Sequence, residues 1–187
     1  MNKIISLFFR ILNSIIGKHY YPLLLNLMHY KKNTFRGHSL ENNIKYLDKI
    51  IYDLNINSLL DFGCGKPIFY NPSPYKKELE IYLYDPYYYK FRTAPSKKYD
   101  LVIATDVMEH IEKNNVNNVI QQITSYAKKA IYLSICTRPA KKKLPDGRNA
   151  HVNIMNNLQW IKIIKKIKKK DLKIFIRFDE NSRLNII

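Results

Sequence analysis

The stretch that decides the fold is Ser58-Leu-Leu-Asp-Phe-Gly-Cys-Gly-Lys66, an apolar run that ends in an acid and an alternating glycine turn. A short apolar run with such an ending is typical of a buried parallel strand. Glycine has no Cβ, so Gly63 and Gly65 let the chain turn sharply and let a ligand approach the backbone closely. The stretch therefore predicts a nucleotide-like cofactor at the end of a first strand.

The glycine spacing separates the classes of nucleotide-binding loop. A dinucleotide fingerprint needs a third glycine three residues after the second, and this position holds Ile68. A P-loop needs a longer spacer between its glycines and a Ser or Thr after the lysine, whereas Lys66 is followed by Pro67. The remaining pattern is Asp-x-Gly-x-Gly. An unrelated glycine turn in another α/β protein is the alternative for this motif alone.

Two further strands are predicted, each followed by acidic residues. Residues 79–84 alternate apolar and aromatic side chains, and Asp85 ends them about twenty residues after the glycine turn, where an acid can bind ribose hydroxyls. A turn-capping aspartate ahead of Pro86 is the alternative. Residues 101–104 form another short apolar run. Ligand clefts lie at the carboxyl ends of such strands, so Asp106, Glu109 and His110 are expected at the cleft.

These segments together resemble the class I S-adenosylmethionine-dependent methyltransferases. The glycine turn has the form of that family's first motif, and residues 106–111, Asp-Val-Met-Glu-His-Ile, resemble its acid-Val-Leu-Glu-His-Val signature. The resemblance implies a Rossmann-like α/β fold and an enzyme that transfers a methyl group from S-adenosyl-L-methionine to a small-molecule, lipid or glycan acceptor. The cofactor-binding residues that it implies are Asp61, Phe62, Gly63, Cys64, Gly65, Asp85, Pro86, Thr105, Asp106 and Val107.

The segment between Asp85 and Asp100 departs from the family pattern. It holds the fourteen residues 86–99, where the usual fold needs a helix, a third strand and another helix. These elements do not fit, because a crossover alone needs at least about ten to twelve residues. We expect the third strand to be reduced or missing, residues 87–91 to form a short turn of helix, and tyrosines to pack near the adenine. A cofactor-binding pseudoenzyme is therefore one alternative function.

A long loop, residues 137–151, is the candidate acceptor site. It follows a fifth strand predicted at residues 130–136, and loops of this length inside a domain are usually functional. His151 and His110 are the candidate catalytic bases, because neutral imidazole accepts a proton near neutral pH. A histidine that only fixes the loop is the alternative for His151. The residues expected to bind the acceptor are Glu109, Arg148 and Asn149.

Helical patterns precede the core. Residues 3–17 carry a wide apolar face, and further helices are predicted at residues 21–30 and 40–54. We divide the chain into a helical extension or lid (residues 1–56) and a methyltransferase core (residues 57–187) that ends in an antiparallel hairpin. The first helix is too short to span a bilayer. It is a lid over the cleft or, since no acid precedes Glu41, a helix in peripheral contact with a membrane.

Charge and cysteine content bear on partners and location. The chain has 32 Lys and Arg against 15 Asp and Glu, a formal net charge of +17, and the excess is concentrated after residue 127. This basic third supports an RNA- or nucleic-acid-directed methyltransferase as an alternative, with a solvated surface as the default. Two cysteines suit a reduced, cytoplasmic protein. Without a Cys-x-x-Cys pair or a histidine cluster, no metal is expected.

Overall fold

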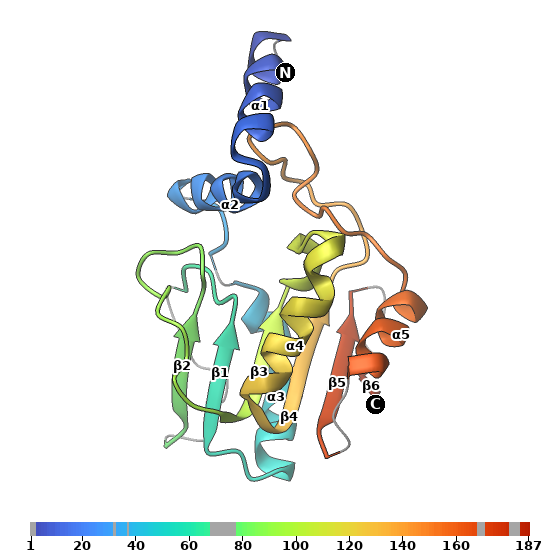
Figure 1. Cartoon of the computed structure of the whole chain (residues 1–187). Coiled ribbons are helices and arrows are strands. Elements are labelled where there is room, and N and C mark those ends of the chain that lie inside the picture. Colours follow the sequence, from blue (N-terminus) through green and yellow to red (C-terminus); the bar gives the residue numbers. More distant parts are fainter. Residues whose placement is uncertain (1–2, 32, 37, 68–77, 168–170, 180–183) are drawn as a thin grey trace.

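One six-stranded sheet in the order β2-β1-β3-β4-β5-β6 forms the centre of the molecule (Figure 1). The computed structural model describes residues 3–31, 33–36, 38–67, 78–167, 171–179 and 184–187. The first five strands of that order run parallel, and β6 runs antiparallel to β5. The strands are β1 (Ser58–Phe62), β2 (Glu80–Tyr84), β3 (Tyr99–Thr105), β4 (Ala127–Ile135), β5 (Lys173–Phe178) and β6 (Leu184–Ile186).

The predicted α/β class and the antiparallel C-terminal hairpin are confirmed. The turn predicted between the two strands of the hairpin, at residues 180–182, lies outside the described residues. The central strands are buried on both faces, so their apolar runs lack the alternation of a half-exposed strand. In β3, Leu101 and Ile103 pack on the side of α3 (Ile44–Asp53), while Val102 and Ala104 pack on the opposite side.

Helices cover both faces of the sheet. Helix α3 lies behind the sheet in Figure 1, and α4 (Val116–Tyr126) and α5 (Asn157–Ile167) lie in front of it. The apolar faces of α4 and α5 contribute Ile123 and Trp160 to the larger core cluster, where both side chains are buried. Because α3 packs on the sheet, it belongs to the layered core by its contacts. The division at residue 56 stays a prediction.

The connection between β2 and β3 is short, as expected, and the usual third strand is missing from it. Residues 86–98 contain hydrogen-bonded turns and neither a helix nor a strand. The predicted turn of helix at residues 87–91 is therefore wrong. The N–H of Tyr88 donates to the Asp85 carbonyl, and the N–H of Asp85 donates to the Phe91 carbonyl (2.9 Å), which closes the segment into a loop.

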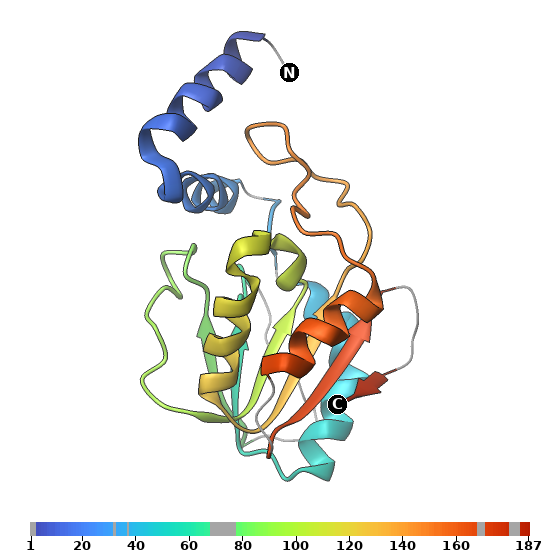
Figure 2. The ribbon, with the colours of Figure 1, turned by 45° about the vertical axis from the view of Figure 1, so that its right-hand side comes forward.

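The N-terminal helices lie beyond the carboxyl edge of the sheet (Figures 1 and 2). Helix α2 (Tyr20–Tyr30) buries Leu24 and Met28 in a cluster with Leu144 and Ala150 of the 137–151 loop. Helix α1 (Lys3–Ile16) projects away from the sheet, and its Ile15 side chain is 72% exposed. Within the described ranges, the structure contains no helix that combines the length and apolar character needed to cross a membrane.

Candidate active site

Two adjoining cavities lie at the carboxyl ends of β1 and β3. Their volumes are about 830 and about 230 Å³. The residues that line both are Phe35, Gly63, Gly65, Asp106 and His110. The larger cavity also contacts the 137–151 loop, and the smaller cavity also contacts the end of β2. Parallel strands thus bring the glycine turn, the acid after β2 and the signature after β3 to one edge, as the sequence predicts.

The glycine turn requires glycine at two positions. The φ angles of Gly63 and Gly65 are +78° and +65°, in the left-handed region that disfavours side chains. A Cβ on Gly63 would lie 2.6 Å from Val107 Cγ2, and a Cβ on Gly65 would lie 2.5 Å from the Phe35 carbonyl oxygen. The close approach to the glycine backbone that the sequence predicts is therefore made by Val107 and Phe35 of the protein itself. The turn lines the cavities beside these contacts, and its role in binding a cofactor stays a prediction.

Asp85 closes the turn and lines the smaller cavity. One carboxylate oxygen accepts the N–H of Gly65, the other accepts the N–H of Tyr87, and both N···O distances are 2.9 Å. His29 of α2 brings its Nε2 to 3.6 Å from the same carboxylate. A carboxylate offers about four acceptor positions, so Asp85 keeps capacity for the ribose hydroxyls that the resemblance implies. The turn-capping and the ligand-binding interpretations of Asp85 are compatible.

The other residues predicted for the cofactor divide into two groups. Asp61 is buried inside β1, between β2 and β3, and is not among the residues that line either cavity. The remaining predicted residues are cavity-lining. The smaller cavity contacts Phe62, Asp85, Pro86 and Val107, the larger contacts Cys64 and Thr105, and both contact Gly63, Gly65 and Asp106.

The signature after β3 contains a strained acid. Asp106 has a φ of +55°, which is costly for a residue with a side chain and typical of functional sites. Its N–H donates to the Ser134 carbonyl at 2.9 Å, which fixes the turn against β4. Burial raises the pKa of the Asp106 carboxyl, and the nearby His151 partly opposes the increase. Among the described residues, Asp106 is the acid that lines both cavities.

His110 lies where the two cavities meet. Its Nδ1 is 2.8 Å from the Ala150 carbonyl, which can only accept, so Nδ1 carries the hydrogen and Nε2 carries a lone pair. Burial, with a contribution from His151, lowers the pKa of His110 to about 4. His110 is therefore neutral near neutral pH, the form that a general base requires.

Glu109 is buried behind the cavities. Its Oε1 accepts the N–H of Cys136 at 3.0 Å, and burial raises the pKa of its carboxyl well above the usual value. It is not among the residues that line the two cavities, so it reaches them only through its neighbours Cys136 and His151. No direct contact between Glu109 and either cavity supports its predicted role in acceptor binding.

The three loop residues that were predicted to act on the acceptor have different surroundings. His151 lines the larger cavity, and its ring centroid lies 4.8 Å from that of His110. The Asn149 side chain accepts the N–H groups of Ala140 and His151, so it fixes the loop. Arg148 pairs with Asp146 at 2.7 Å and is not among the residues that line either cavity.

Comparison with known proteins decides the family. A family model described as a methyltransferase domain matches residues 31–167. The chain belongs to the methyltransferase domain family. No curated protein and no solved structure matches the chain. The matched region begins after α2 and ends with α5, so it contains the glycine turn, Asp85, the signature and the long loop. Membership makes this protein an enzyme of the methyl-transferring class and confirms the resemblance.

Several residues of this methyltransferase escaped the sequence reasoning. Phe35 and Arg36, from the connection after α2, and Arg138 line the larger cavity, and His29 approaches Asp85. The basic lining comes partly from the basic third after residue 127, of which Arg138, Lys141 and Lys142 line the larger cavity. Arg138 lies in the predicted acceptor loop, and His29, Phe35 and Arg36 come from segments without a recognisable motif.

Proposed function

We propose that this methyltransferase transfers the methyl group of S-adenosyl-L-methionine to a small-molecule, lipid or glycan acceptor that carries an anionic group. The observation that carries the proposal is the pair of adjoining cavities. One contains the Asp85 carboxylate, the other contains two histidines and a basic rim, and His110 lines both. A donor and an acceptor bound in adjoining cavities can react across the boundary that they share.

The residues of the smaller cavity fit the donor. We assign its ribose hydroxyls to Asp85 and its methionine end to the turn at residues 63–65, as the family resemblance implies. When bound, the sulfonium of this donor supplies an electrophilic methyl group for an in-line displacement. Tyr87 lines the same cavity and is the tyrosine that we assign to the adenine. Phe35 covers the turn, because the N–H of Lys66 donates to its carbonyl at 2.7 Å.

The larger cavity favours an acceptor with negative charge. Its basic lining residues are Arg36, Arg138, Lys141 and Lys142, and Asp106 is the acid among the described residues that line it. Arg138 pairs with Asp179 at 2.6 Å, whereas Arg36, Lys141 and Lys142 have no carboxylate partner among the described residues. A recess lined by one sign of charge concentrates ligands of the opposite sign.

Catalysis in this arrangement rests on positioning. Holding a nucleophile and the donor carbon in attack geometry supplies much of the acceleration, provided that the cleft excludes water. An acceptor hydroxyl or amine must also lose a proton. We assign this proton to His110 or His151, since each binds a backbone carbonyl through Nδ1 and thereby keeps a lone pair on Nε2.

The test is methyl transfer from S-adenosyl-L-methionine labelled in its methyl group. The acceptor panel holds matched small molecules, lipids and glycans with and without an anionic group, and an RNA. We expect label in an anionic acceptor. We also expect the double variant Lys141→Ser/Lys142→Ser to raise KM for that acceptor several-fold with little change in kcat.

The control for this test is Lys162→Ser on α5, which removes one basic residue away from the cavities and should change neither constant. Transfer to neutral acceptors alone contradicts the proposed anionic group. Transfer to RNA alone supports the nucleic-acid alternative. Cofactor binding without transfer to any acceptor supports the pseudoenzyme alternative.

We also propose that α1 lies on an anionic membrane surface. Its exposed apolar side chains repeat at helical spacing, and they are Ile4, Ile5, Leu7, Phe8, Ile11 and Ile15. None of the described residues that line the two cavities belongs to α1, whereas Met28 of α2 and Phe35 line the larger one, which supports a lid formed by the segment after α1. The segment also carries the basic residues Arg10 and Lys18, and no acid precedes Glu41. An amphipathic helix of this composition suits a lipid interface.

A further inference from the structure

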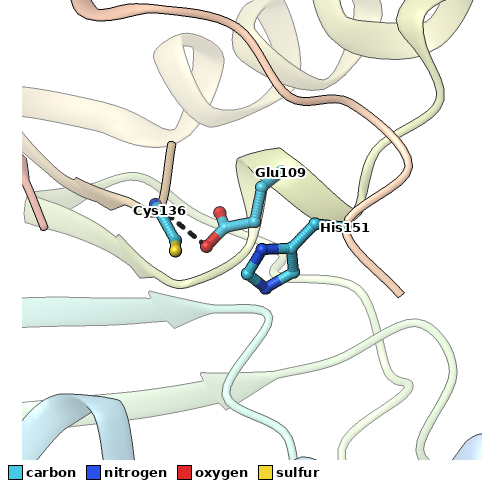
Figure 3. Close-up of side chains that lie close together, drawn as sticks. All are labelled: Glu109, Cys136 and His151. Atoms are coloured by element: carbon cyan, nitrogen blue, oxygen red, sulfur yellow. Dashed lines mark hydrogen bonds between the residues drawn. The ribbon is translucent and has the colours of Figure 1, made fainter. Parts of the chain in front are cut away.

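Three side chains of different chemistry meet at the edge of the larger cavity. In the described part of the chain, Glu109, Cys136 and His151 bring a carboxylate oxygen, the thiol sulfur and a ring nitrogen within 4.8 Å of one another. Figure 3 shows the three side chains converging from separate segments. Glu109 comes from the 3₁₀ turn Met108–His110, Cys136 follows β4, and His151 ends the long loop.

Among the described residues, only one of the two carboxylate oxygens of Glu109 has a hydrogen-bond partner. The side chain is fully buried, and its Oε1 accepts the N–H of Cys136 (dashed in Figure 3). Its Oε2 is buried without a hydrogen-bond partner among the described residues. A buried polar atom without a partner is costly, and a buried carboxylate is normally paired or bound to a metal. The Glu109 carboxylate therefore has capacity for a further ligand, and the oxygen with the dashed bond in Figure 3 is the one that faces the Cys136 sulfur and the His151 ring.

His151 is held in a tautomer that suits metal binding. Its Nδ1 lies 2.6 Å from the Arg138 carbonyl, which can only accept, so Nδ1 carries the hydrogen. Histidines that bind a metal commonly donate their other ring N–H to a backbone carbonyl in this way. Cys136 is also constrained, since its thiol donates to Asp179 at 3.1 Å. The cluster is thus oriented by bonds outside it.

We infer that Glu109, Cys136 and His151 form a binding site for a divalent transition metal, with Zn²⁺ as the best match. One sulfur, one nitrogen and one oxygen ligand suit zinc, whereas Mg²⁺ and Ca²⁺ prefer oxygen ligands alone. Zinc bonds of about 2.0 to 2.3 Å require the three atoms to approach one another by about 1 Å. On binding, the Cys136 thiol releases its proton to solvent, and the two anionic ligands balance the ion's charge.

The fourth ligand position would face the larger cavity, because Cys136 and His151 both line it. Three protein ligands with one open position are the arrangement of catalytic rather than structural zinc sites. An ion bound there would engage His151 and leave His110 as the base. The sequence carries no spacing that marks this site, since its three ligands come from separate segments.

The experiment measures metal binding by the full chain without reference to activity. The protein is stripped with a chelator, dialysed, and titrated with Zn²⁺ in competition with a chromophoric chelator. Co²⁺ is then used as a spectroscopic probe, because a thiolate ligand gives it a charge-transfer band. We expect one ion per chain and a thiolate-to-cobalt band. The variants Cys136→Ser and His151→Asn should weaken zinc binding more than about a hundredfold, since losing a hydrogen-bond partner of a ligand alone costs about 10- to 100-fold.

The matched control is Cys64→Ser, which removes the other cysteine and should leave both the zinc affinity and the cobalt band unchanged. Absence of zinc binding by the folded parent, or binding that survives Cys136→Ser, would overturn the inference. The same samples are titrated with S-adenosylhomocysteine. A chain that binds this nucleoside but no zinc contradicts the metal site alone, and a zinc-binding chain that transfers no methyl group contradicts the proposed function alone.

Discussion

Gly65 shows at the scale of one residue why the motif is built of glycine. We predict that Gly65→Ala lowers the free energy of unfolding by on the order of 3 kcal/mol, because it adds a collision to the cost of about 1–2 kcal/mol for a left-handed side-chain residue. The collision is with backbone, the Phe35 carbonyl oxygen at 2.5 Å, which cannot rotate away as a flexible side chain does. Urea denaturation measures the loss.

Gly17 provides the matched control for this prediction. Its φ is +49°, so alanine is strained there too, but a Cβ would meet no atom within 4 Å. Gly17→Ala should therefore cost only about 1 kcal/mol. Equal losses in the two variants would show that Phe35 does not press on the turn.

Site residues could be predicted from the sequence where a local motif marks them. Asp85 and the residues after β3 are examples, because parallel strands carry their carboxyl ends to one edge whatever the helices do. Arg148 could not be placed in this way. Its guanidinium pairs with Asp146 and lies near the rings of Tyr20 and Tyr21, and nothing in its own loop reveals that α2 is there.

Helices and strands also differ in how well they could be predicted from the sequence. The buried strands and the helices on the sheet could be predicted, because long apolar runs and helical periodicity are strong signals. The helical turn expected at residues 87–91 could not be judged from the sequence. The segment is closed by the hydrogen bond between Asp85 and Phe91, and that closure depends on where β2 ends against β1.

Helix α1 carries a prediction of its own. We predict that the full chain sediments with vesicles of anionic phospholipid and only weakly with neutral ones, and that salt reduces the binding. The double variant Phe8→Ser/Ile11→Ser should bind at least about tenfold more weakly, because two apolar side chains no longer enter the lipid. Both side chains are more than half exposed, at 58% and 51%.

The control for α1 is Tyr52→Ser. Tyr52 is an 86% exposed residue of α3, and in Figure 1 helix α3 lies by the sheet, away from α1. Loss of Tyr52 should leave vesicle binding unchanged. If the double variant sediments as the parent does, α1 is not the contact with lipid.

At the scale of the whole molecule, the net charge follows from the sequence, but its distribution over the structure does not. The sequence shows a basic last third, and the structure places one part of that charge in the lining of the larger cavity and another part on helix α5. Lys141 and Lys142 belong to the first group, and Lys162 belongs to the second. Only the first group bears on the acceptor, and the loop that carries it is positioned by its packing on α2.

The central claim is that the glycine turn and Asp85 bind the methyl donor. Its most direct test is a calorimetric titration of the full chain with S-adenosylhomocysteine, repeated on Asp85→Asn and on Glu80→Gln, an exposed acid of β2, the strand that Asp85 follows. The Asn variant keeps the size of the side chain and one oxygen for the loop N–H groups, and circular dichroism checks its fold.

We predict one binding site in the parent and in Glu80→Gln. In Asp85→Asn the affinity should fall about 10- to 100-fold, because a hydrogen bond to a charged group contributes about 1.5–3 kcal/mol. No binding by the folded parent, or the same affinity in Asp85→Asn, would contradict the assignment.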